Sequence, residues 1–191
     1  MSKSRRLKRA GWSVGVTMTL MAPGAQVRGQ ETPRPEAWSS ALELLAGTWE
    51  GEIDGKLGVG KGMRRYEFVL GGRFLLSRHL SVRLPQAKSA KGDQHEEIGV
   101  FSYDTERKTI VYREFMVEGV VVQSPCAVTG TKVVCTSESV ESGPGIRARL
   151  TLEIADRFRF TEKYELAFPG EELQPYVTVH WTRSAVPRGW N

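Results

Sequence analysis

Apolar and polar residues alternate with a period of two along most of this chain, from Thr48 to Ser184. This alternation is typical of β-strands that bury one face. Turn residues such as Gly, Pro, Asp and Ser divide the pattern into short segments. Ten strands are predicted, at 48–54, 63–70, 73–84, 96–103, 109–117, 120–128, 132–140, 146–154, 158–168 and 176–184.

One short helix is predicted ahead of the first strand. Ser40 and Glu43 have the spacing of a capping box, leucines follow, and Gly47 ends the segment. Ten strands with short connections and no second helix predict an all-β fold, a closed antiparallel up-and-down barrel. Closure leaves no unpaired sheet edge, and a helical turn over 40–46 would plug one end of the barrel.

Three charged residues interrupt otherwise apolar strand faces, and these are candidates for the barrel interior. Arg78 alternates with Phe74, Leu76, Leu80 and Val82, and Glu114 and Glu162 interrupt later strands in the same way. A buried unpaired charge costs several kcal/mol, so Arg78 and Glu162 are expected to lie close together. A functional cluster would orient a carboxylate or hydroxyl of a ligand, with Tyr164 and His180 beside it. The alternative is an internal ion pair that only fills the barrel.

The other two histidines are predicted to lie outside the site. His79 shares a face with Ser77 and Ser81 and is expected to meet solvent, and His95 is placed in the polar loop before the fourth strand. No second ligand is specified by spacing around His180, so no metal site is predicted. The chain has no nucleophile elbow, phosphate-binding loop or paired-histidine motif, and no catalytic residue is assigned.

Cys126 and Cys135 are predicted to form a disulfide. A two-residue turn at Gly130-Thr131, with Gly in the first central position, suits a type II′ hairpin. Counting outward from that turn places the two cysteines opposite each other in a non-hydrogen-bonded pair, where side chains approach most closely. Such a bond persists in oxidising compartments, which favours an exported protein.

Residues 1–30 are predicted to be an export signal. A basic segment from Lys3 to Arg9 precedes an apolar stretch and then small residues, as in secretory signals. Residues 31–39 form a predicted linker, and 40–186 the barrel domain. The chain's net charge of +5 belongs to this leader, which holds six of the 27 basic residues and no acidic one. The rest is nearly neutral, so nucleic-acid binding is not predicted, and neither is a membrane span after signal removal.

Three segments resemble a known family. Leu45-Ala-Gly-Thr-Trp-Glu-Gly51, Val69-Leu-Gly-Gly-Arg-Phe-Leu75 and Ile98-Gly-Val-Phe-Ser-Tyr-Asp104 together resemble a bacterial family of calycin-like domains, domain of unknown function 1579, over roughly residues 44–184. The opening Gly47-x-Trp49-x-Gly51 is also similar to the nitrobindins, ten-stranded haem-binding barrels, and more distantly to the lipocalins.

The resemblance implies a closed end and a ligand cavity. In calycins the Trp of the opening motif packs beneath a basic residue of the last strand, which implies that Arg183 stacks on Trp49 and bonds carbonyl groups of the helical turn. The expected function is a periplasmic or extracellular barrel that binds a small apolar or amphipathic molecule, without a cofactor. The alternatives are a haem-binding barrel, with His180 in the region of the haem ligand, and an enzyme that uses the internal carboxylates.

Overall fold

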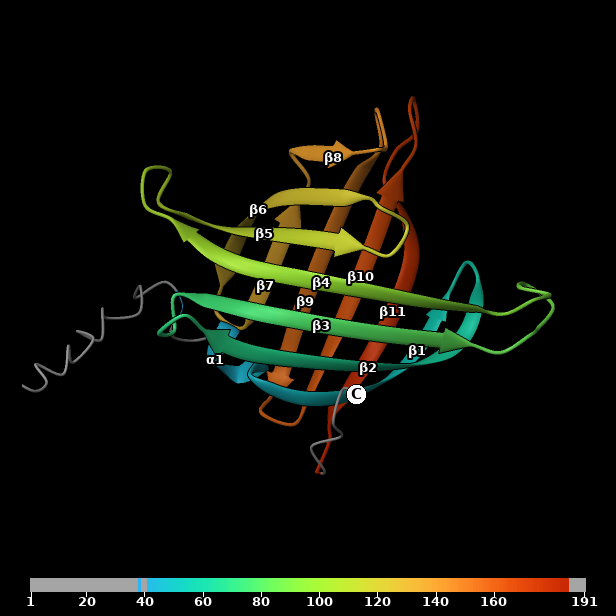
Figure 1. Cartoon of the computed structure of the whole chain (residues 1–191), viewed down its shortest axis with the longest axis horizontal. Coiled ribbons are helices and arrows are strands. Elements are labelled where there is room, and N and C mark those ends of the chain that lie inside the picture. The colour runs from blue at the N-terminus through green and yellow to red at the C-terminus, as the bar shows by residue number, and fades with distance from the viewer. Residues whose placement is uncertain (1–37, 39–40, 186–191) are drawn as a thin grey trace, which may run out of the picture. The chain divides into compact units, whose positions relative to one another are not determined.

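The computed structural model describes Trp38 and residues 41–185. The predicted export signal lies outside these residues, as does most of the predicted linker. One helix, α1 (Ala41–Leu45), precedes eleven strands (Figure 1). These are β1 (Gly47–Gly55), β2 (Gly58–Val69), β3 (Phe74–Arg83), β4 (Asp93–Asp104), β5 (Thr109–Met116), β6 (Val121–Thr129), β7 (Lys132–Thr136), β8 (Ser139–Glu141), β9 (Arg147–Asp156), β10 (Arg159–Ala167) and β11 (Gln174–Arg183).

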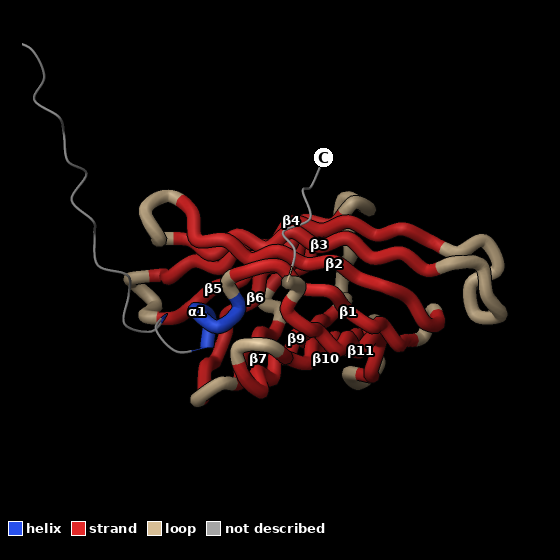
Figure 2. Tube along the Cα trace, turned by 90° about the horizontal axis from the view of Figure 1, so that it is seen from below, coloured by secondary structure: helices blue, strands red, loops and turns tan. Residues whose placement is uncertain are grey.

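Ten of the strands close into one antiparallel barrel, which confirms the predicted fold class. Each strand from β1 to β6 pairs with the next, and the ring continues from β7 through β9, β10 and β11 back to β1. α1 lies at one end of the barrel and packs against β9 (Figure 2). α1 is far too short to cross a bilayer, and no helix within the described residues could do so.

The predicted strand at 132–140 is split in two by Ser137 and Glu138. The Ser137 amide donates to the carbonyl of Ala148 on β9, whereas the Glu138 amide donates to that of Gln123 on β6, each at 2.9 Å. β8 then pairs with β6, and within residues 41–185 it has no pairing with β9. The sheet therefore separates between β8 and β9 on the side away from α1.

Apolar packing is concentrated at the end that holds α1. Trp38, Trp49 and Phe160 are buried there, and the rings of Trp49 and Phe160 meet edge to face with centroids 4.8 Å apart. Leu42 and Leu45 of α1 are buried in the same core and cover this end of the barrel. The opposite end carries the hairpin and loop that join β1 to β2 and β3 to β4, and it contains the cavity.

Candidate functional site

A cavity of about 310 Å³ lies inside the barrel at the end opposite α1. Most of its wall residues are apolar, namely Ile53, Val122, Val140, Ile146, Ala148, Leu166, Val177 and Val179, and an ion pair of Arg83 with Asp93 also lines it beside the β3–β4 loop. Its floor is polar, where His79, His95, Glu97 and Glu162 reach it from β3, β4 and β10. This volume is at the lower end of the range for ligand pockets, which fits a small molecule.

Arg64 of β2 holds the polar floor together. Its side chain is 1% exposed, and its Nη2 lies 3.2 Å from an oxygen of Glu97 and 3.2 Å from an oxygen of Glu162. It also donates to the hydroxyl of Tyr66 at 3.2 Å. Burying a guanidinium is tolerable because two carboxylates compensate it. The sequence pattern did not identify Arg64, because Arg64 and Arg65 are adjacent and alternation alone does not say which one points inward.

Glu97 joins Arg64 to the histidines. Its Oε1 accepts a hydrogen bond from the hydroxyl of Tyr112 at 3.2 Å and faces Arg64, which leaves Oε2 toward the cavity. Gly99 makes room for this arrangement, because a Cβ at that position would lie 2.1 Å from the Tyr112 hydroxyl. Burial by itself would raise the pKa of Glu97, but Arg64 and the two histidines hold that pKa well below its usual value.

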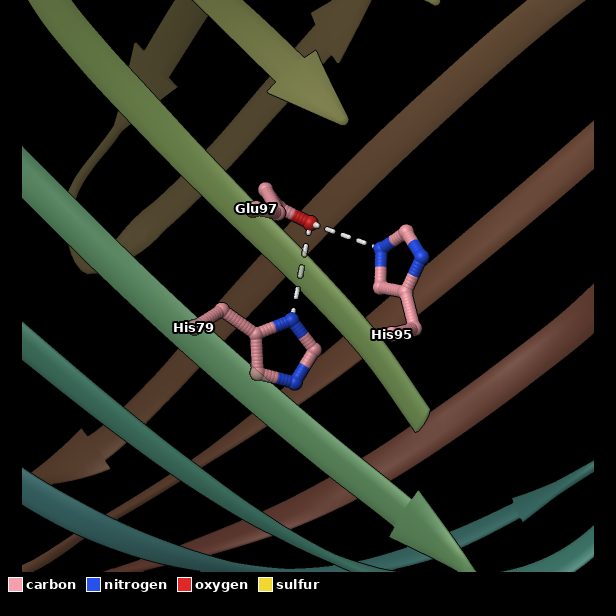
Figure 3. A group of neighbouring side chains, drawn as sticks. All are labelled: His79, His95 and Glu97. Atoms are coloured by element: carbon pink, nitrogen blue, oxygen red, sulfur yellow. Dashed lines mark hydrogen bonds and ion pairs between the residues drawn. The ribbon is translucent and has the colours of Figure 1, made fainter. Parts of the chain in front are cut away.

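Two histidines face Glu97 across the cavity floor (Figure 3). His79 Nδ1 lies 3.5 Å and His95 Nε2 3.8 Å from Glu97 Oε2, and His95 Nδ1 lies 2.9 Å from Glu118 Oε1. Burial, assisted by Arg64, lowers the pKa of His79 to about 4. The contact with Glu97 raises the pKa of His95 against the effect of burial, and Glu118 adds to the rise.

Both predictions for these histidines are wrong. His79 is 8% exposed and lines the cavity, and His95 lies within β4, which begins three residues before the predicted fourth strand. The inner face of β3 is polar because it borders the cavity floor, whereas its apolar face looks outward. The available signal was the spacing of His95 and Glu97, which places both side chains on one face of a strand.

The carboxylates of Glu114 and Glu162 point inward, as predicted. Glu162 accepts a hydrogen bond from the Trp181 indole at 3.0 Å besides its contact with Arg64, and burial raises its pKa. Glu114 is 3% exposed, and Tyr164, which lines the cavity, places its hydroxyl 3.5 Å from it. Burial and the charge of Glu97 raise the pKa of Glu114 well above its usual value, which favours its neutral form.

Arg78 and His180 do not lie in this cavity, and their predicted inward positions are wrong. Both side chains are exposed on the outer wall, where His180 contacts Thr161 at 3.3 Å. On β3 the period of two is correct, but the buried and exposed faces are interchanged relative to the prediction. With His180 outside, the sequence-based reason for a haem ligand in the interior is gone. Arg64 occupies the place predicted for Arg78 beside Glu162.

The predicted contacts at the closed end are confirmed. The Arg183 guanidinium lies 4.2 Å from the centroid of the Trp49 ring and donates to the carbonyls of Leu44 and Ala46, each at 2.6 Å. Trp49 in turn donates from its indole nitrogen to the carbonyl of Leu45 at 2.7 Å. These contacts fix α1 across the end of the barrel and have no access to the cavity.

The cysteine pair also matches the prediction. Cys126 and Cys135 are directly opposite in the β6–β7 hairpin and form a disulfide, and Gly130 has a φ of +58° in the turn between them. Both sulfurs are buried.

Comparison with known proteins supports the barrel fold. No family model and no curated protein matches the chain, so membership of domain of unknown function 1579 stays a prediction. The crystal structure of Rv2717c from M. tuberculosis is 17% identical, with a TM-score of 0.58, over 80% of this chain and 99% of that one. A structure of EF1p2_mFAP2b bound to DFHBI is 12% identical, with a TM-score of 0.33, over 75% of this chain and 97% of that one. At these identities the first similarity shows a shared fold, and the second is too remote to carry an argument.

Proposed function

We propose that this barrel binds a small amphipathic molecule in its cavity, with the apolar part against the apolar walls and a polar group at the floor. The observation that carries the proposal is the division of the cavity into apolar walls and a buried polar floor. Ligand sites commonly combine apolar walls with a few well-placed polar groups that orient the molecule. The buried disulfide supports the further proposal that the protein acts after export, in the periplasm or outside the cell.

The charges of the floor favour one kind of polar group. Arg64 is already shared between Glu97 and Glu162, so the carboxylates outnumber the guanidinium. A ligand carboxylate would meet these acceptors and be repelled, whereas a hydroxyl or an amine can donate to them. Without any bound metal ion, the barrel is therefore expected to prefer a ligand with an alcohol or amine head group to one with a carboxylate.

Calorimetric titration of the EDTA-treated protein with octanol, octylamine and octanoate tests this preference. These molecules share an alkyl chain and differ in the head group. Octanol and octylamine should bind with one molecule per chain, and octanoate at least about tenfold more weakly, as expected for an uncompensated like charge. Native mass spectrometry of the purified protein should show a small molecule that copurifies.

Two alanines of the barrel provide matched variants. Ala148 is buried and lines the cavity, whereas Ala127 is exposed on β6. Ala148→Phe should fill the cavity and abolish octanol binding, while Ala127→Phe should leave it unchanged. Equal binding by both variants, or no saturable binding by the wild-type protein to any of the three probes, would contradict the proposed function.

A further inference from the structure

The structure brings together three side chains of a kind that binds metal ions, His79, His95 and Glu97. One ligand atom from each lies within 4.8 Å of the others (Figure 3). We propose that they form a site for a divalent transition-metal ion such as Zn²⁺. Two imidazoles and one carboxylate with a further position open are the ligand set of many catalytic zinc sites and of non-haem iron sites.

The backbone places these ligands on neighbouring strands. His95 and Glu97 are two residues apart on β4, so both side chains leave the same face of the strand. His79 of β3 is the direct cross-strand partner of Glu97. The arrangement is thus fixed by two neighbouring strands of the barrel, β3 and β4. Strands hold metal ligands more accurately than loops do, because they are more rigid.

The spacing of the ligand atoms is close to what an ion requires. Zinc binds imidazole nitrogen and carboxylate oxygen at about 2.0–2.2 Å, so atoms around one tetrahedral ion lie about 3.4 Å apart. Glu97 Oε2 is 3.5 Å from His79 Nδ1 and 3.8 Å from His95 Nε2. All three ligand atoms lie within 4.8 Å of one another, so side-chain rotations that bring the two imidazole nitrogens closer together would complete the site.

The surroundings of the histidines fit this role. Glu118 faces Nδ1 of His95 at 2.9 Å, which directs the other nitrogen toward Glu97, as in carboxylate–histidine–metal arrangements. The Nε2 of His79 is buried and has no hydrogen-bond partner among the described residues. Its Nδ1 contact with Glu97 is at the limit of a hydrogen bond. An ion between the three groups would bind Nδ1 of His79 and replace this weak contact, and it would leave Nε2 as the N–H of the neutral ring.

The charge of the floor also accommodates a cation. Glu97 directs Oε1 to Arg64 and Tyr112 and Oε2 to the histidines, so the ion and the guanidinium contact different oxygens. Glu162 contacts the same nitrogen of Arg64, Nη2, and so also compensates its charge. Because all three ligands line the cavity, the remaining coordination position faces it, open to water or to a donor atom of a bound molecule.

A titration of the full, untagged protein with Co²⁺ alone, after EDTA treatment, tests the site. Co²⁺ should bind at one ion per chain, with visible absorption bands of a low-coordinate site, and Zn²⁺ should displace it. The chain has three histidines, which provides an internal control. His95→Ala should lower the Co²⁺ affinity at least about tenfold, whereas His180→Ala, on the outer wall, should leave it unchanged.

A second variant keeps the test valid if His95→Ala does not fold. Glu118→Gln removes a partner of His95 and no ligand, and it should weaken Co²⁺ binding by about tenfold. The absence of saturable binding to wild-type protein would overturn the proposal, and so would equal losses in the His95 and His180 variants. In that case an ion pair of protonated His95 with Glu97 and Glu118 accounts for the cluster. No amphiphile is present in this titration, so its outcome is independent of the proposed function.

Discussion

Arg64 contacts two buried carboxylates and a buried hydroxyl in the interior of this barrel. Its buried guanidinium compensates Glu97 and Glu162 together, and it helps to keep Glu97 ionised and His79 neutral. Among the described residues Glu114 has no ion pair with this cation, and it accepts a hydrogen bond from the hydroxyl of Tyr164 at 3.5 Å. The buried carboxyl groups of this interior thus shift in different directions: despite burial, Arg64 and the histidines lower the pKa of Glu97, whereas burial raises the pKa of Glu114 and of Glu162.

The protonation of Glu114 has a measurable consequence. Its pKa in the folded barrel lies well above the usual value of 4.5, so the stability contributed by its neutral form is lost as the pH rises through the folded pKa. Glu114→Gln cannot ionise. Over about pH 5 to 9, the free energy of unfolding of this variant should increasingly exceed that of the wild-type protein.

Urea denaturation across that pH range is the measurement. Glu106→Gln, at an exposed turn position, is the control and should show a constant difference from the wild-type protein. A Glu114→Gln variant whose relative stability falls with rising pH would show that Glu114 is ionised in the folded state.

Among the elements, β3 and the β6–β7 hairpin show which features of a strand the alternation of apolar and polar residues can predict. In β3 the buried residues at 77, 79, 81 and 83 are all polar, because this face borders the cavity floor. In the hairpin, the turn sets the register, so the opposition of Cys126 and Cys135 could be counted directly from Gly130. Local geometry decides the second case, whereas the first depends on what lies across the barrel.

The disulfide is expected to stabilise the barrel modestly. The closed loop is short, with a sequence separation of 9, which in the chain-entropy model corresponds to about 2–3 kcal/mol. The double variant Cys126→Ala, Cys135→Ala should lower the free energy of unfolding by that amount in urea denaturation. Wild-type protein in excess dithiothreitol should approach the same value. Labelling of both cysteines by a thiol reagent without prior reduction and without unfolding would show that the bond is absent.

For the barrel as a whole, one end is built for stability and the other contains the proposed binding site. The closed end is held by α1, buried aromatic rings and Arg183, and the other end holds the cavity with its polar floor. Because ten strands form a continuous ring, packing at the closed end supports the site without taking part in it. Variants at the two ends should therefore affect stability and binding separately.

Arg183→Lys tests this separation. The guanidinium donates to carbonyls of Leu44 and Ala46 and also to that of Arg157, and a lysine ammonium cannot form the same set of contacts. The free energy of unfolding should fall by about 1–3 kcal/mol, while octanol binding to the folded protein stays unchanged. Arg159→Lys, at an exposed position of β10, is the matched control and should be neutral. A loss of binding without a loss of stability would contradict the assignment of Arg183 to a structural role.

The sequence by itself determined the fold class, the disulfide and the contact of Arg183 with Trp49. The first two depend on local information, a period of two over ten strands and a turn that sets one register, whereas the third was implied by the resemblance to the calycins. The inward positions of Glu114 and Glu162 also followed from local information, since apolar neighbours on their own strands defined the buried face.

Only the tertiary structure decided which polar residues share the interior. Arg64, His79 and Glu97 come from three successive strands of the ring. On each strand the period of two would equally well allow the opposite face, with the adjacent residues, to point inward. A buried charge is stable when its partners across the barrel compensate it, and those partners are set by closure and register. For that reason the pattern assigned Arg78 to the interior, whereas the folded chain buries Arg64 between two carboxylates and brings two histidines to the cavity floor.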